Sequence, residues 1–246
     1  MRKTLNEYHC DFHIHSCLSP CADITMTPGV VARKLSEKGV DWIAITDHNS
    51  TMNARSFGVR LKREGIRVIP GIEVHSSDDV HVLGYFFDLD SAESFSGWLY
   101  KKIPDVSVDP EVFGYQIYVN EEDQFTGIEE KWLGQPVSLN TSQVIDALKD
   151  AGALAVYAHI DRSMGVVYQL GGLGEDSFPA DIEVAFERNY ETYSDCRRYF
   201  VWHSSDSHSP NTLAPAMKIR CESRTLQKLI EAVHSCDRER KTIIWG

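Results

Sequence analysis

The stretch "DFHIHS" at residues 11–16 places two imidazoles, His13 and His15, one residue apart at the end of an apolar run. In an extended strand alternate side chains share a face, so both rings point to the same side of the sheet. Two neutral imidazoles that converge on one point are typical of a metal site. Such a site needs further ligands from other parts of the chain.

The length and composition of the chain are those of an ordinary globular protein. It has 246 residues, of which 42% are hydrophobic and 25% are charged, and no apolar run approaches the ~20 residues that span a bilayer. The N-terminal residues "MRKTLNEYHCD" lack the apolar segment of a secretory signal. We therefore expect a cytoplasmic protein without a membrane partner.

The cysteines and the net charge narrow the function classes further. The six cysteines form no CxxC pair, which favours free thiols in a reduced compartment. The formal net charge of −11 predicts no broad basic face, so we expect no stable binding of duplex DNA. The negative charge does not exclude an enzyme that acts on a short or singly phosphorylated substrate, because bound cations would make its pocket locally positive.

Strand-like apolar runs alternate with helical patterns, which indicates β/α units around a mostly parallel sheet. The predicted strands are residues 8–15, 41–48, 66–74, 80–87, 153–159, 181–185 and 199–208. Helices are predicted from Pro28 to Gly39 with Thr27 as N-cap, over 52–65 and 141–151, and at the C-terminal end after a Ser223 cap.

Residues 103–140 interrupt this rhythm, since they are acidic, rich in turn residues and without helical periodicity. We predict an insertion that contains a hairpin of 115–119 against 124–128, joined at Asn120–Asp123. Such an insertion could cover an active site or decorate the surface.

We expect the residues that commonly bind metals to fall at the carboxyl ends of the predicted strands. Besides the first pair they are His48, Glu73, His81, His159, Asp206 and His208. The carboxyl ends of parallel strands face one side of a barrel or open sheet, so these side chains should converge in one cleft. Mixed imidazole and carboxylate donors suit Zn, Mn or Fe better than Mg or Ca. We expect two or three divalent ions with one bridging carboxylate, a cluster that typically hydrolyses its substrate with a metal-bridged hydroxide.

Taken together, the segments "DFHIHS", "ITDHNS", "GIEV", "HVLGYF", "AHID" and "SSDSH" resemble the PHP (polymerase and histidinol phosphatase) family of metal-dependent phosphoesterases. They lie between residues 11 and 208, nearly the whole chain, in the family's order. The resemblance implies a distorted (β/α)7 barrel with a trinuclear metal site at the C-terminal ends of the strands. It also implies that residues 1–246 form one catalytic domain, which contains the insertion at about 103–140.

Position by position, the resemblance implies the ligands of two of these metals. The first metal would be bound by His13, His15, Glu73 and Asp206. Glu73 would bridge to a second metal held by His81 and His159. Catalytic roles would then belong to Glu73, Asp206 and His208.

The third metal would take His48, His208 and one ligand from the loop after His15. This loop departs from the family pattern, because Pro20 and Cys21 stand where a His or Asp is expected. Either the Cys21 thiolate or the Asp23 carboxylate could complete the site, and we slightly favour Asp23.

Four further residues have two possible roles each. Arg162 and Arg188 could bind a substrate phosphate through the guanidinium fork, or form surface ion pairs. His75, two residues after Glu73, could contact substrate or face solvent. Asp47 could orient a metal-bound imidazole or cap the end of its strand.

We predict a metal-dependent phosphoesterase that acts on a nucleotide, a short oligonucleotide or a small phosphorylated metabolite. The same cluster could cleave an amide or another ester, and a non-catalytic metal-binding sensor is a further alternative. A serine or cysteine nucleophile is disfavoured, because no GxSxG segment occurs and the cysteines lack a diagnostic setting.

Overall fold

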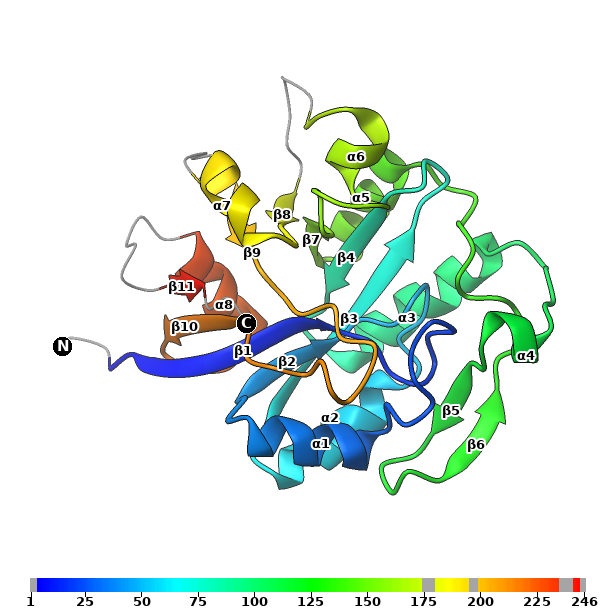
Figure 1. Cartoon of the computed structure of the whole chain (residues 1–246), viewed down its shortest axis with the longest axis horizontal. Helices are drawn as coiled ribbons and strands as arrows, with labels where there is room; N and C mark the ends of the chain where they lie inside the picture. The colour runs from blue at the N-terminus through cyan, green and yellow to red at the C-terminus, as the bar shows by residue number, and fades with distance from the viewer. Residues whose placement is uncertain (1–3, 174–179, 195–198, 235–240, 244–246) are drawn as a thin grey trace.

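A computed structural model describes residues 4–173, 180–194, 199–234 and 241–243. Seven strands pair side by side in one sheet, in this order: β1 (Asn6–Ile14), β2 (Trp42–Ile45), β3 (Arg67–His75), β4 (His81–Tyr85), β7 (Leu154–Tyr157), β8 (Asp181–Glu183) and β9 (Val201–Trp202). Beyond β9, Ser207 forms a parallel bridge to Ile14 at the end of β1, which brings the two edges together. The sheet is therefore a nearly closed, distorted barrel, as predicted from the sequence (Figure 1).

Two further strands lie outside this ring. Strand β10 (Met217–Cys221) pairs antiparallel with β1, and β11 (Lys241–Ile243) pairs antiparallel with β10. They extend the sheet to nine strands.

Strand β4 runs antiparallel to both of its neighbours, β3 and β7, and so departs from the parallel arrangement predicted for this region. Only residues 76–80 separate β3 from β4. A parallel crossover needs about a dozen residues or more, so the chain turns back as a hairpin. His81 consequently lies at the amino end of its strand, paired with His75 at the carboxyl end of β3.

The helices cover the outside of the sheet. They are α1 (Pro28–Glu37), α2 (Ala54–Arg63), α3 (Leu89–Leu99), α5 (Thr141–Asp150), α6 (Val166–Leu170), α7 (Glu187–Ser194) and α8 (Leu226–Val233), with a 3-10 turn η1 (Tyr100–Lys102) after α3. Figure 1 shows α1 and α2 on one side of the sheet and α5 and α6 on the opposite side.

Two predicted helix starts can be compared with the structure. Helix α1 begins at Pro28 after Thr27, as expected. Helix α8 is capped by Thr225, whose side chain accepts a hydrogen bond from the Lys228 N–H, and not by Ser223. An N-cap must directly precede the first helical residue to reach that N–H, and Ser223 lies two positions too early.

A buried aromatic cluster joins strands from both halves of the barrel. The ring of Phe12 on β1 packs edge-on against Trp42, Tyr85 and Trp202, at centroid distances of 5.3, 6.4 and 5.6 Å. The Tyr85 hydroxyl donates to the Phe12 carbonyl at 2.9 Å. Each such buried ring stabilises the fold by about 2–3 kcal/mol, so this cluster holds β1, β2, β4 and β9 together.

The predicted hairpin in the insertion is present. Strands β5 (Ile117–Val119) and β6 (Phe125–Ile128) pair antiparallel after a short helix, α4 (Pro110–Phe113). Asp123 in its turn accepts from the Gly29 N–H at the start of α1 (2.6 Å), and Ser56 on α2 donates to the Val119 carbonyl (2.7 Å). The insertion is therefore bound to the body of the barrel.

Among the residues that the structure describes, no helix has both the length and the apolarity needed to cross a lipid bilayer. Cys10, Cys17, Cys21 and Cys221 are free thiols, as expected. Cys196 and Cys236 lie outside the described residues.

Candidate metal centre

Glu73, near the end of β3, lies at the centre of a cluster of buried histidines. Five imidazoles contact its carboxylate, those of His13, His15, His48, His81 and His159. The nitrogen-to-oxygen distances run from 2.9 Å for His81 to 3.3 Å for His13. The Glu73 side chain is only 1% exposed, so the barrel gathers these rings around a carboxylate removed from water.

The loop after β9 adds a second carboxylate and a sixth imidazole. Asp206 Oδ1 lies 3.2 Å from Nε2 of both His13 and His15, and 3.6 Å from Nδ1 of His208. The His208 ring stacks on His15 with centroids 4.1 Å apart. The bridge between Ser207 and Ile14 holds this loop beside β1.

The ligand atoms form three groups within which all atoms lie within 4.8 Å of one another. These groups are His13, His15 and Asp206; His48, Glu73 and His81; and His15, His48 and His208. His159 joins the cluster through Glu73, at 3.1 Å. Distant parts of the chain thus converge as the sequence predicted.

The hydrogen bonds around His13 and His15 show that the donor atoms fit cations. His13 Nδ1 donates to Glu183 Oε1 (3.0 Å), and His15 Nδ1 donates to Ser19 Oγ (2.8 Å). Each Nε2 atom can then present a lone pair, and both face Asp206 Oδ1, a buried atom without a hydrogen-bond partner in the described part of the chain. Acceptors that converge in this way repel one another unless a proton or cation lies between them. Zn, Mn and Fe suit this mixed imidazole and carboxylate set.

Asp47 orients His15 indirectly, through Ser19. The Ser19 hydroxyl donates to Asp47 Oδ1 at 2.7 Å, so its oxygen is free to accept from His15 Nδ1. Ser19 Oγ also accepts from the backbone N–H of His48 at 3.1 Å. A carboxylate behind a ligating histidine commonly sets its tautomer in this way.

Glu183, at the end of β8, is the residue at this site that the sequence reasoning missed. Its side chain is 2% exposed, and Oε1 accepts from His13 Nδ1 and from the His159 backbone N–H, at 3.0 and 3.2 Å. An acidic residue within the apolar strand "DIEVA" is a sequence signal that could have identified it, because buried carboxylates almost always have a partner.

Burial and charge divide the imidazoles into two classes in the absence of a cation. Burial lowers the pKa of His81 to about 3 and that of His208 to about 2. Burial acts in the same direction on His13, but the negative charges of Glu183 and Glu73 outweigh it and raise the pKa of His13 to about 10. His81 and His208 can therefore bind a cation without losing a proton, whereas His13 must release one.

Two candidate ligands occupy strained backbone conformations. His159 has φ of 26° and Asp206 has φ of 50°, in the left-handed region that non-glycine residues rarely adopt. Ser205 N–H donates to Asp11 Oδ1 (3.0 Å) and Ser207 N–H donates to the His13 carbonyl (3.3 Å), on either side of Asp206. Strain that the surroundings enforce is typical of functional positions.

The two candidates for the third site lie in different surroundings. Asp23 is exposed, and its Oδ1 accepts from the backbone N–H (2.8 Å) and hydroxyl (2.7 Å) of Thr25. Cys21 is also exposed at the surface, yet desolvation and the negative charge of Glu73 raise the pKa of its thiol to about 12. Within the described ranges, neither residue belongs to the three groups of ligand atoms.

The three predicted substrate-binding residues lie in three different surroundings. The Arg162 guanidinium forms an ion pair with Asp206 Oδ2, at the edge of the cluster. His75 Nδ1 and Nε2 each lie 3.2 Å from an acceptor, the Gly134 carbonyl and Asp79 Oδ1. Arg188 is exposed, with its guanidinium carbon 4.6 Å from the centre of the Phe186 ring.

A pocket of about 530 Å³ opens beside the cluster. It is lined by His159, Arg162, Asp206 and His208, and its remaining lining residues are Glu183, Ala185, Phe186, His203, Ser204, Ser205, Thr212, Ala214, Pro215 and Ala216. A substrate in this pocket would meet the candidate ligands and a guanidinium together.

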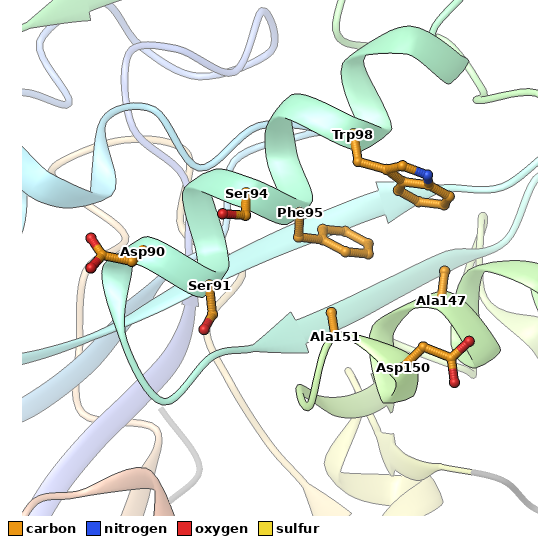
Figure 2. A pocket seen from close by; sticks show the side chains of 8 residues that line it. All are labelled: Asp90, Ser91, Ser94, Phe95, Trp98, Ala147, Asp150 and Ala151. Carbon is orange, nitrogen blue, oxygen red and sulfur yellow. The ribbon is translucent and has the colours of Figure 1, made fainter.

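A second pocket, of about 630 Å³, lies between α3 and α5 and holds none of the candidate ligands. Figure 2 shows Phe95 and Trp98 of α3 facing Ala147 and Ala151 across this pocket. It is separate from the histidine cluster.

Comparisons with known proteins show the family of the chain. The family model of the PHP domain matches residues 11–164. A phosphoribosyl 1,2-cyclic phosphate 1,2-diphosphodiesterase from Eggerthella lenta is 37% identical over 82 residues, which cover 30% of this chain and 29% of that protein.

Solved structures share the fold at low identity. The lesion-specific endonuclease Q from Pyrococcus furiosus gives a TM-score of 0.67 at 16% identity, and an endonuclease Q complex with a 27-mer duplex that carries an abasic lesion gives 0.66 at 17%. Each match covers 97% of this chain and 58% of that chain. A two-domain protein from Bacteroides vulgatus that contains a predicted PHP-like metal-dependent phosphoesterase gives a TM-score of 0.57 at 18% identity, over 98% of this chain and 66% of that one. This chain thus spans less than a third of the diesterase and little more than half of endonuclease Q.

Proposed function

The chain belongs to the PHP domain family, and from this premise we propose that it is a metal-dependent phosphoesterase whose metal centre is the cluster around Glu73. One observation carries the proposal: five imidazoles lie within 3.3 Å of this single buried carboxylate. A carboxylate so surrounded is suited to bridge two cations, which is the arrangement that hydrolytic two-metal sites use.

We propose two or three divalent ions of zinc, manganese or iron. His13, His15, Glu73 and Asp206 would hold the first, and Glu73 would share the second with His81 and His159. The contacts of Glu73 with His81 (2.9 Å) and His159 (3.1 Å) support this division.

The third ion would take His48 and His208, with Cys21 or Asp23 completing its ligands. Asp23 Oδ1 accepts two hydrogen bonds from Thr25, so Asp23 would serve through Oδ2 or after these bonds break. Cys21 lies near enough to Glu73 to respond to its charge. Asp23→Asn and Cys21→Ser variants, compared by metal content, distinguish the two.

The ions, when bound, would polarise the phosphoryl oxygens and lower the pKa of a bound water. Side chains beside the ions would position the substrate. The Arg162 guanidinium can donate two parallel hydrogen bonds to phosphate oxygens at the mouth of the centre. The low pKa of His208 leaves its ring neutral, which suits a ligand better than a proton donor.

The substrate that we propose is a phosphate ester of a nucleotide, a short oligonucleotide or a small metabolite. The pocket of about 530 Å³ has the size of a small-molecule site. Its lining is partly apolar and includes Phe186 and Pro215. The absence of duplex binding remains a prediction from the charge of −11, and the duplex complex of endonuclease Q gives it no support.

We retain three further predictions as part of the proposal. Residues 1–246 act as one catalytic domain, the segment 103–140 is an insertion in it, and the protein works in the cytoplasm, which the free thiols favour.

The test is an activity assay of the whole chain before and after metal removal. The chain, stripped with a chelator and reloaded with Mn²⁺, Zn²⁺ or Fe²⁺, is given a phosphomonoester, a 3′,5′-bisphosphate, a single-stranded oligonucleotide, a lesion-containing duplex and an amide. We expect hydrolysis of small phosphate esters, lost on stripping and restored on reloading. Turnover of the amide alone would instead support another class of hydrolase. Tight metal binding without any turnover would support a sensor, and unchanged phosphoesterase activity after complete stripping would exclude the proposed mechanism.

A further inference from the structure

We propose that Glu183 is a positioning residue that joins the two halves of the metal centre. One of its oxygens holds the ring of His13 and the backbone of His159 at the same time. The inference rests on the metal ligation proposed above, in which His13 and His159 bind different ions.

The first contact sets the ring of His13. A carboxylate can only accept, so the bond of 3.0 Å between His13 Nδ1 and Glu183 Oε1 places the ring proton on Nδ1. Once metal binding displaces the second ring proton, Nε2 carries the lone pair, and it lies 3.3 Å from Glu73 Oε1 and 3.2 Å from Asp206 Oδ1. Without this acceptor the ring could turn or take the other tautomer, and the donor atom would be lost.

The second contact holds the strained backbone of His159. Its φ of 26° is costly for a residue with a side chain. The His159 N–H donates to Glu183 Oε1 at 3.2 Å, and the Ile160 N–H donates to the Glu183 carbonyl at 2.8 Å. These two bonds fasten the turn after β7 to β8, and the turn directs His159 Nε2 toward Glu73 Oε1 at 3.1 Å.

Glu183 acts without contacting the ions itself in this arrangement. Its side chain is 2% exposed, and the described ligand groups do not include it. Because one atom serves ligands of both ions, its removal should weaken two sites together. Loss of an outer hydrogen-bond partner typically costs 10–100-fold in metal affinity.

Two variants of equal side-chain length separate the acceptor from the volume that it fills. Glu183→Gln keeps an acceptor oxygen, whereas Glu183→Met removes it and keeps a similar shape. Metal affinity is measured by titration calorimetry of the whole chain with Zn²⁺ and Mn²⁺, and metal content by mass spectrometry. The tautomer of His13 is read from ¹⁵N chemical shifts of the Zn²⁺-loaded protein, in which the ring has given up its second proton.

We expect Glu183→Met to lower the affinity of two ions at least tenfold and to disturb the His13 Nδ1–H signal. Glu183→Gln should stay within about threefold of the wild type, because it restores the acceptor. The control is Glu129→Gln, a buried glutamate of the insertion that accepts from the Tyr100 hydroxyl (2.9 Å) and the Lys131 N–H (2.8 Å). It should leave metal binding unchanged.

Wild-type affinity in Glu183→Met, or equal losses in the Gln and Met variants, would overturn the inference. Should Glu183→Met not fold, Glu183→Asp withdraws the oxygen by one methylene, and unchanged affinity there would overturn it as well. These outcomes require that the wild type binds metal. A wild-type chain that binds none would refute the proposed metal centre instead, so the two failures are distinguishable.

Discussion

The guanidinium of Arg162 forms an ion pair with Oδ2 of Asp206, while Oδ1 of the same carboxylate faces the Nε2 atoms of His13 and His15. Arg162 is 36% exposed and Asp206 17% exposed, so the pair lies where the cluster opens to the pocket. The guanidinium is therefore within reach of both a candidate metal ligand, Asp206, and an incoming anion.

Arg162→Ala should lower kcat/KM for a small phosphate ester about 100-fold, because a guanidinium in this position stabilises charge on the transferred phosphoryl group. The kcat/KM of Arg162→Lys should lie between those of the wild type and Arg162→Ala, since lysine keeps the charge but lacks the guanidinium fork. Steady-state kinetics at saturating metal measure the effect. Arg60→Ala, which removes a surface pair with Glu64, is the control and should change kcat/KM less than twofold. Wild-type kinetics in Arg162→Ala would argue against substrate contact.

Glu73→Gln should lose at least one bound ion per chain, because the neutral amide offers a single acceptor oxygen and cannot bridge two ions. Hydrolysis should fall by at least about 1,000-fold, because the variant removes the negative charge that would hold two ions together. Metal content after gel filtration, measured by mass spectrometry, reports the loss. Full occupancy in this variant would show that Glu73 does not bridge.

Metal binding should release a proton from His13 at neutral and mildly alkaline pH. Its pKa in the metal-free chain is raised to about 10 by Glu183 and Glu73 against the effect of burial, so the ring is protonated until a metal displaces the proton. The apparent affinity of the first ion should therefore rise about tenfold per pH unit up to about pH 10. Calorimetry at pH 8 in two buffers of different ionisation enthalpy counts the released protons. No release at this pH would contradict the assignment.

The same shift predicts how the stability of the metal-free chain changes with pH. The pKa of His13 is higher in the folded state than the ordinary value of about 6.5. Its contribution to the free energy of unfolding is thus complete below about pH 6.5 and is lost as the pH rises toward 10. Denaturant unfolding of the metal-free protein at pH 6 and pH 9.5 measures this loss of unfolding free energy. In His13→Gln the difference in unfolding free energy between the two pH values should be smaller.

Gly114→Ala should disturb both the insertion and the third metal site. Gly114 has φ of 94°, and an added Cβ would lie 1.8 Å from the Pro20 carbonyl oxygen, in the loop between His15 and Cys21. We expect a loss of about 2–4 kcal/mol in the free energy of unfolding. We also expect weaker binding of the third ion.

Gly152→Ala is the matched control for this variant. Gly152 has φ of 73° but nothing within 4 Å of an added Cβ, so only the backbone strain of about 1–2 kcal/mol remains. Equal thermal shifts in the two variants would show that the contact with Pro20 is unimportant.

The sequence alone predicted the barrel and brought most of the candidate ligands together, because both depend on local patterns. Alternation in "DFHIHS" places His13 and His15 on one face of a strand whatever the rest of the chain does. The carboxyl ends of parallel strands share one edge, so Glu73 and His159 could be placed together without coordinates. The hairpin at 117–128 followed from its turn residues.

Only the tertiary structure decided the contacts between residues far apart in the chain. The direction of β4, which brings His81 beside Glu73, depends on how residues 76–80 turn back against β3. Glu183 meets His13 across 170 positions, and no local pattern encodes that distance. Burial and partners such as these arise from the path of the whole chain, and they, rather than residue type, set the protonation and orientation of each ligand.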